Sequence, residues 1–169
     1  MQFLSEAKHM KVGYKLLNGR KVYFSPNVMG KFFLYRQINR KLKEAGGLII
    51  GRYLLENNHQ VIDKITEPIK RDKRSIFSFF RSNKHNHYLK KAWEKSDKTQ
   101  TLMGTWHTHP ESDPKPSNKD FEDWKNILNK GDYIGNSLIF VIVGIDKIRI
   151  WENNNYNMFT EITEINKGG

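Results

Sequence analysis

Hydrophobic residues recur along this 169-residue chain with two different periods, which together predict a mixed domain of the α/β (α+β) class. Alternating or continuous apolar runs predict a hairpin over 11–24 and strands over 48–55, 61–65, 101–109, 137–143, 148–151 and 158–162. Apolar residues at three- and four-residue steps predict helices over 26–43, over 86–96 and from Ser117 to about Gly131. Turns are expected at Asn18-Gly19, Asn57-Asn58, Gly144–Asp146 and Asn153–Asn155.

No internal repeat or long linker separates these elements, so we expect one domain over residues 1–169. Its centre is a curved mixed β-sheet, with a long helix before Glu44 and another after the strand that carries His107 and His109. On that strand, alternation places Leu102, Gly104 and Trp106 on the face opposite the two histidines.

Residues 67–100 differ from the rest because lysine and arginine alternate there with aromatic residues. This segment is predicted to be an insertion, or a segment that contacts the substrate. It contains the pair His85 and His87, which on a helix do not face each other, so we expect neither to bind a metal.

Composition narrows the chemistry. The chain has no cysteine, which excludes disulfides, a thiolate nucleophile and a cysteine-bound zinc. No run is apolar enough for a signal peptide or a membrane span, so we expect a soluble, cytoplasmic protein without membrane contact. The net charge of +11 favours an acidic partner, which could be nucleic acid, an anionic surface or a protein.

The clearest chemical signal lies between Gly104 and Asp120. Because side chains two apart on a strand share a face, His107 and His109 lie about 6–7 Å apart along the chain and can reach one ion. Pro110 ends the strand, and the helix that follows can place Asp120 in its first turn near both histidines. Two histidines and one carboxylate leave a tetrahedral Zn²⁺ with one position for a catalytic water, as in catalytic zinc sites.

A hydrolytic site also needs a general base. Glu44 precedes a Gly-Gly-apolar strand that could run beside the histidine strand, and it is our candidate. Parts of the pattern also fit simpler roles. Ser117 and Asp120 match a helix-capping pattern, and a histidine pair on a strand is often only packed or exposed. Neither role accounts for Glu44, both histidines, Ser117 and Asp120 together, and capping is compatible with metal binding.

The motif His107-x-His109, seven residues, Ser117, two residues, Asp120, with Glu44 upstream, resembles that of the JAMM (JAB/MPN+) metallopeptidases. The resemblance covers roughly residues 20–150 and implies a single MPN/JAB-like domain. It implies one Zn²⁺ per chain bound by the two histidines and Asp120, with Glu44 as general base. Ser117 would stabilise the tetrahedral oxyanion. The implied activity is cleavage of an isopeptide or peptide bond after the C-terminus of a ubiquitin-like protein.

Within this family the sequence is most similar to the bacterial stand-alone branch. Two roles in that branch are open: deconjugation of a ubiquitin-like protein from a CD-NTase in CBASS anti-phage defence, which we favour, and processing of a sulfur-carrier ubiquitin-like protein. Two alternatives from other classes are a basic nucleic-acid-binding or nuclease module, suggested by the charge but not favoured, and a metal-free scaffold of the same fold.

Overall fold

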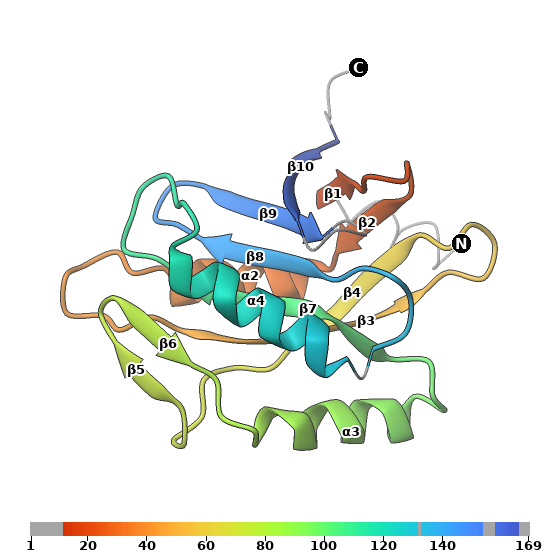
Figure 1. Ribbon diagram of the computed structural model, residues 1–169, viewed down its shortest axis with the longest axis horizontal. Coiled ribbons are helices and arrows are strands. Elements are labelled where there is room, and N and C mark those ends of the chain that lie inside the picture. The colour runs from red at the N-terminus through yellow and green to blue at the C-terminus, as the bar shows by residue number, and fades with distance from the viewer. Residues whose placement is uncertain (1–11, 132, 154–157, 166–169) are drawn as a thin grey trace.

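The computed structural model describes residues 12–131, 133–153 and 158–165, and it shows a β-barrel flanked by helices (Figure 1). The strands follow one another around the barrel in the order β1-β10-β9-β8-β7-β3-β4-β2. Their bounds are β1 (Val12–Lys15), β2 (Lys21–Phe24), β3 (Gly46–Tyr53), β4 (Gln60–Ile65), β7 (Thr101–Thr108), β8 (Ile139–Val143), β9 (Ile148–Asn153) and β10 (Phe159–Glu164). These are the strands expected from the apolar runs, with bounds shifted by at most two residues.

The sheet is mixed, as expected, but it closes on itself. Strand β2 is parallel to β4 and β7 is parallel to β8, whereas the other neighbours are antiparallel. Closure comes from β1, which pairs with β2 on one side and with β10 on the other. The apolar pattern of each strand predicts that strand but not the pairing of the first strand with the last. The expected curved sheet is therefore corrected to a closed barrel.

The first helix, α2 (Pro26–Tyr35), begins where Ser25 accepts a hydrogen bond from Val28 N–H and where Pro26 fits the first helical turn. It ends at Tyr35, so its predicted extension to Lys43 is wrong. The chain turns out of the helix because Gln37, which is almost fully buried, forms hydrogen bonds with other segments of the fold. Residues 36–45 are consequently a loop, and Glu44 lies near its end.

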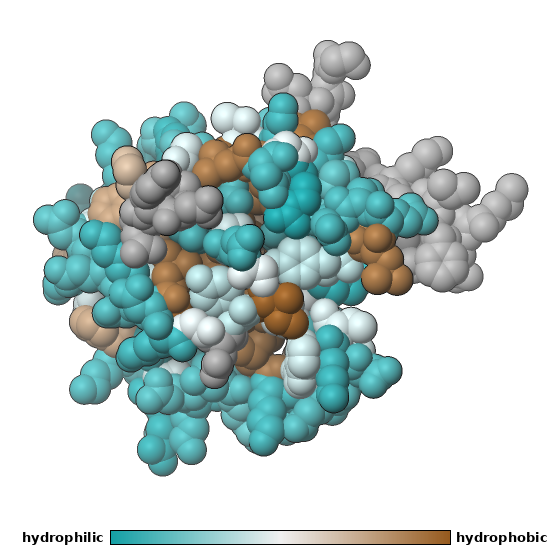
Figure 2. Space-filling view, turned by 45° about the vertical axis from the view of Figure 1, so that its right-hand side comes forward, coloured by the Kyte–Doolittle hydropathy of each residue, from teal (hydrophilic) through white to brown (hydrophobic). Residues whose placement is uncertain are grey.

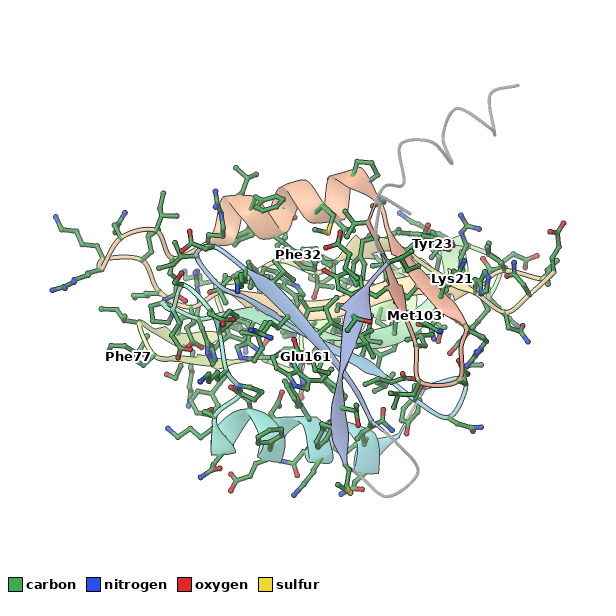
Figure 3. The ribbon with its side chains drawn as sticks, turned by 90° about the horizontal axis from the view of Figure 1, so that it is seen from above. Lys21, Tyr23, Phe32, Phe77, Met103 and Glu161 are labelled. Atoms are coloured by element: carbon green, nitrogen blue, oxygen red, sulfur yellow. The ribbon has the colours of Figure 1, made fainter. Side chains whose placement is uncertain are left out.

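Two further helices, α3 (His85–Lys95) and α4 (Asn118–Lys130), flank the strands, and α4 ends at Gly131 in the left-handed conformation. Figure 3 shows α2 and α4 on opposite sides of the strands. One core cluster joins α2, through Val28 and Phe32, to Trp106 and the inner residues of the barrel. A second cluster joins α4, through Trp124 and Leu128, to the outer residues of β7, β8 and β9.

The segment 67–100 contains the two-stranded hairpin β5 (Lys73–Ser75) and β6 (Ser78–Phe80), followed by α3. A buried network fixes its base: His85 Nε2 lies 2.9 Å from Asp72 Oδ2, and His85 Nδ1 lies 2.7 Å from Thr66 Oγ1. Both ring nitrogens of His85 are therefore engaged, one by Asp72 and the other by Thr66.

The surface is largely polar. On the face in Figure 2, hydrophilic residues cover most of the molecule and hydrophobic residues form separate patches between them. Within the described part of the chain, no helix combines the length and the apolar character needed to cross a membrane.

Candidate metal centre

The two histidines of the motif lie at the end of β7, between strands β3 and β8. His107 pairs with Gly46 of β3 and with Ile142 of β8, and His109 N–H donates to the Val143 carbonyl just beyond the strand. Both histidines are at least nine-tenths buried, and their Nε2 atoms lie 3.0 Å apart. The backbone pairing on both sides of β7 thus fixes the two imidazoles toward one point.

The alternation of side chains along β7 is shifted by a bulge. Ile49 pairs with Gly104 and Ile50 with Leu102, so Met103 is an extra residue between them. A Cβ at Gly104 would lie 1.6 Å from the Ile139 carbonyl oxygen, which leaves room only for glycine. Leu102 therefore packs toward α4, on the side of the histidines, and its expected placement on the opposite face is wrong. Trp106 lies in the other core cluster, as expected.

The third member of the group, Asp120, is in the first turn of α4. A loop containing Pro110, Pro114 and Pro116 leads from β7 to Ser117, which is the N-cap of the helix. Asp120 Oδ1 lies 3.1 Å from His107 Nε2, and its Oδ2 lies 3.1 Å from His109 Nε2. The two histidines and Asp120, predicted from their spacing in the sequence, are brought together at one point.

This donor set fits a metal ion. All three ligand atoms lie within 4.8 Å of one another. A tetrahedral zinc with bonds of about 2.0–2.1 Å sets its ligand atoms about 3.3 Å apart, close to the separations of 3.0 and 3.1 Å observed here. Two facing Nε2 atoms can form a hydrogen bond only when one of them carries a proton and the other does not, whereas a cation satisfies both lone pairs at once.

Glu44 lies beside this group, at the entrance to β3. Its Oε1 is 4.0 Å from His109 Nε2, and the residue is only 4% exposed. Burial raises the pKa of Glu44 to about 8, with His109 opposing the shift and Asp120 and Glu111 adding to it. A carboxyl group whose pKa lies near neutrality can both accept and release a proton at physiological pH, which suits a general base.

The electrostatics of the other members follow from their mutual contacts. Burial disfavours the charged form of Asp120, but hydrogen bonds from His107, His109 and the Ser117 N–H outweigh it and lower the pKa of Asp120. Burial likewise disfavours protonation of His109, yet its hydrogen bond to Asp120 and the nearby carboxylates raise the pKa of His109. Asp120 therefore carries the negative charge of the group.

Ser117 has a different position from the other candidates. It is exposed, and its Oγ accepts a hydrogen bond from Asp120 N–H at 3.2 Å, while its own N–H donates to Asp120 Oδ2 at 2.7 Å. These two bonds form the expected capping box. Ser117 orients Asp120 directly, and its hydroxyl still has a proton to donate.

Sequence reasoning missed Glu111. The Nδ1 atom of His109 is buried without a hydrogen-bond partner, and Glu111 Oε1 lies 3.6 Å from it. Histidines that bind metals usually donate their second ring N–H to such a carboxylate. The available signal was the position of Glu111 two residues after His109. Spacing alone does not show that the Glu111 side chain points back toward the His109 ring.

Comparison with known proteins supports the resemblance. Residues 33–155 match the family described as prokaryotic homologs of the JAB domain. The chain is 32% identical over 114 residues to a Pseudomonas aeruginosa protein named CD-NTase/cGAS isopeptidase, covering 67% of this chain and 71% of that protein. A Vibrio cholerae protein of the same name is also 32% identical, over 119 residues that cover 70% of this chain and 72% of that protein.

The fold has a solved counterpart. A solution structure of a protein from Desulfitobacterium hafniense superposes with a TM-score of 0.57 at 17% identity, covering 84% of this chain and 88% of that one. The family match spans well over half of the chain and includes the two histidines, Asp120 and Glu44. This chain therefore belongs to the prokaryotic branch of the JAB (JAMM/MPN+) domain family.

Proposed function

We propose that this protein is a zinc-dependent isopeptidase that cleaves the bond after the C-terminus of a ubiquitin-like protein and thereby removes that protein from a modified CD-NTase. The observation that carries the proposal is the convergence of two imidazole nitrogens and one carboxylate beside a buried Glu44. The names of the similar proteins from Pseudomonas aeruginosa and Vibrio cholerae support the isopeptidase activity and the CD-NTase target.

His107, His109 and Asp120 are the proposed zinc ligands. With zinc held by these three residues, the site would gain a Lewis acid and a water whose pKa is lowered toward neutrality. Glu44 takes a proton from the attacking water and delivers it to the amine nitrogen as the C–N bond breaks. The hydroxyl group goes to the carbonyl carbon, so the products are a carboxylic acid and a free amine. Ser117 donates a hydrogen bond to the oxygen on which negative charge develops, a contribution of about 3–4 kcal/mol in comparable sites.

The segment 67–100 is the proposed contact with the substrate. A cavity of about 820 Å³ lies between α3 of this segment and α4, and it is lined by Arg81, Leu89, Leu102, Asp123 and Ile127 among others. Asp123 is one helical turn beyond Asp120, so this groove approaches the metal centre along α4. Phe77, at the turn of the β5–β6 hairpin, is exposed and lies at the edge of the molecule in Figure 3.

The test is cleavage of a ubiquitin-like protein joined to a lysine of a CD-NTase, by the zinc-loaded wild type and by His109→Ala and Glu44→Gln. We expect the wild type to release both proteins, and both variants to leave the conjugate intact. A linear fusion after the same C-terminus tests the alternative of sulfur-carrier processing. Cleavage of the linear fusion alone would favour that alternative. Tight DNA binding at physiological salt, with no cleavage, would instead favour a nucleic-acid-binding module.

A further inference from the structure

One buried side chain connects the loop before Glu44 with two other parts of the fold. Gln37 is 1% exposed and follows the end of α2. Its Nε2 donates to the Leu42 carbonyl at 3.2 Å and to the Ile76 carbonyl in the β5–β6 hairpin at 2.9 Å. Its Oε1 accepts a hydrogen bond from Thr108 Oγ1 at 2.9 Å. All three bonds go to separate segments, so the amide of Gln37 has one orientation in which it is satisfied.

Thr108 extends this connection to β7, the strand that leads to the two histidines. It lies between His107 and His109, is fully buried, and its Oγ1 accepts a hydrogen bond from Ala45 N–H at 2.9 Å. The Thr108 N–H in turn donates to the Ala45 carbonyl at 2.8 Å. The residue that follows Glu44 is therefore tied twice to the residue between the two histidines.

Glu44 itself is held from the other side by the β5–β6 hairpin. Its N–H donates to the Ser75 carbonyl at 2.8 Å, and its carbonyl accepts a hydrogen bond from Arg74 Nε at 2.7 Å. Gln37 fixes the hairpin at Ile76, the next residue after Ser75. The backbone on both sides of Glu44 is thus set by bonds that meet at Gln37 and Thr108.

From these contacts we infer that Gln37 and Thr108 are positioning residues that hold the carboxylate of Glu44 at the metal centre. The inference rests on the proposed function, in which Glu44 transfers the proton. Both residues act through the backbone of residues 42–45, so they position Glu44 and take no part in the reaction themselves.

The local sequence opposes this arrangement, which explains why the bonds are needed. The apolar spacing of residues 26–43 favours a continuous helix, and in the observed loop Ile38 is 64% and Leu42 is 39% exposed. Ending α2 at Tyr35 thus leaves two apolar side chains in water. Without the Gln37 hydrogen bonds, the helical preference of residues 36–43 would no longer be opposed, and the loop that positions Glu44 would shift. A displacement of a catalytic group by about 1 Å can lower a catalytic rate by about 100-fold.

The test compares Gln37→Met with Gln60→Met. Gln60 is an equally buried glutamine, at 2% exposed, on β4, paired with Tyr53 at the end of β3 remote from Glu44. Thr108→Val and Thr108→Ser form a second pair, because valine has the shape of threonine without the hydroxyl and serine keeps the hydroxyl. The readouts are kcat and KM on the conjugate, zinc content, and amide hydrogen exchange of the metal-free proteins.

For Gln37→Met and Thr108→Val we expect kcat to fall about 100-fold with KM within about twofold of wild type. Zinc content should be retained, and exchange should accelerate at the amides of Glu44 and Ala45 but not in β8 and β9. Gln60→Met and Thr108→Ser should behave like the wild type.

Wild-type kcat or unchanged exchange at Glu44 and Ala45 in Gln37→Met would overturn the inference. If that variant does not fold, the Thr108 pair decides by the same two measurements. An inactive, zinc-loaded wild type would overturn the proposed function instead, while hydrogen exchange would still decide whether Gln37 holds the loop.

Discussion

Ser117 and Asp120 bind each other through reciprocal hydrogen bonds, while the carboxylate of Asp120 also reaches both histidines. Ser117 Oγ accepts from Asp120 N–H, and Asp120 Oδ2 accepts from Ser117 N–H at 2.7 Å while lying 3.1 Å from His109 Nε2. The carboxylate of Asp120 thus takes part in the capping of α4 and also completes the donor set. Because the capping bonds fix its orientation, the ligand group is preorganised before any ion binds.

Removal of the Asp120 carboxylate should abolish metal binding. We expect about one zinc per chain in the wild type and almost none in Asp120→Asn, because only two histidines remain of the three proposed protein ligands. Asparagine keeps an oxygen that can accept from Ser117 N–H, so the helix content by circular dichroism should not change. The matched control is Asp123→Asn, one turn along α4, which should retain its zinc. Full zinc content in Asp120→Asn, measured by elemental analysis, would exclude Asp120 as a ligand.

Glu44 should be dispensable for binding but not for turnover. Glu44→Gln keeps the size of the side chain but cannot accept the proton, so kcat should fall by about 10²–10⁴-fold. Zinc content should stay at the wild-type value, because the three ligand atoms belong to other residues. Cleavage of the conjugate, sampled at several times, measures this loss of kcat. Turnover at the wild-type rate would refute the role of Glu44 as base.

Zinc should stabilise the fold. A ligand that binds only the folded state at 1,000 times its Kd adds about 4 kcal/mol to the free energy of unfolding. Treatment of the zinc-loaded wild type with a chelator should therefore lower Tm, measured by calorimetry. The same treatment should leave the Tm of His109→Ala unchanged, since that variant lacks the ligand. Equal shifts in both proteins would show that the chelator acts elsewhere.

The Asp72–His85 pair should make stability depend on acid pH. Burial disfavours the charged carboxylate, but hydrogen bonds from the Ile69 and Ser82 N–H groups and from His85 outweigh it and lower the pKa of Asp72 from its ordinary 3.8. The unfolded state then binds more protons, so this stabilisation is present above pH 3.8 and is lost as the pH falls through the lower folded-state pKa.

Asp72→Asn should accordingly lower the free energy of unfolding near neutral pH by about 1.5–3 kcal/mol, as expected when hydrogen bonds to a buried charged group are weakened. As the pH falls from 5 to below 3.8, the free energy of unfolding of this variant should change less than that of the wild type. Urea unfolding at several pH values provides the comparison. Asp97→Asn, a substitution at an exposed position, is the control. Parallel pH profiles for wild type and Asp72→Asn would contradict the assignment.

Glu111 should tune the metal centre through His109. The distance between Glu111 Oε1 and His109 Nδ1 is 3.6 Å, slightly longer than a hydrogen bond, and the two groups form an ion pair when His109 is protonated. Loss of such a partner typically weakens metal affinity by about 10–100-fold, so Glu111→Gln should show a higher Kd for zinc in competition titrations. Glu122→Gln, on the exposed side of α4, should bind zinc like the wild type. Identical affinities for all three proteins would rule out this role.

Much of the secondary structure follows from the sequence because it depends on local patterns. The strands at 46–53, 101–108 and 139–143 are apolar runs, and Ser117 shows the capping pattern that begins α4. The metal-ligand candidates were also local: two histidines at the end of one strand, and an acid in the first helical turn that follows.

Contacts between distant segments decide the remaining features. Helix α2 ends at Tyr35 because the buried amide of Gln37 bonds to Ile76 and Thr108, and these bonds outweigh the helical pattern that continues to Lys43. Leu102 changes face because a bulge at Met103 shifts the alternation, and the sheet closes because β1 pairs with β10.

The sequence by itself therefore determined which residues are candidates for a metal centre, since residue type and spacing along one strand and one helix are local properties. Only the tertiary structure decided how Glu44 reaches that centre and that Glu111 lies beside His109. The position of Glu44 comes from hydrogen bonds across 30 or more residues, such as that from Arg74, whose energy depends on the whole fold and leaves no periodic trace in the sequence.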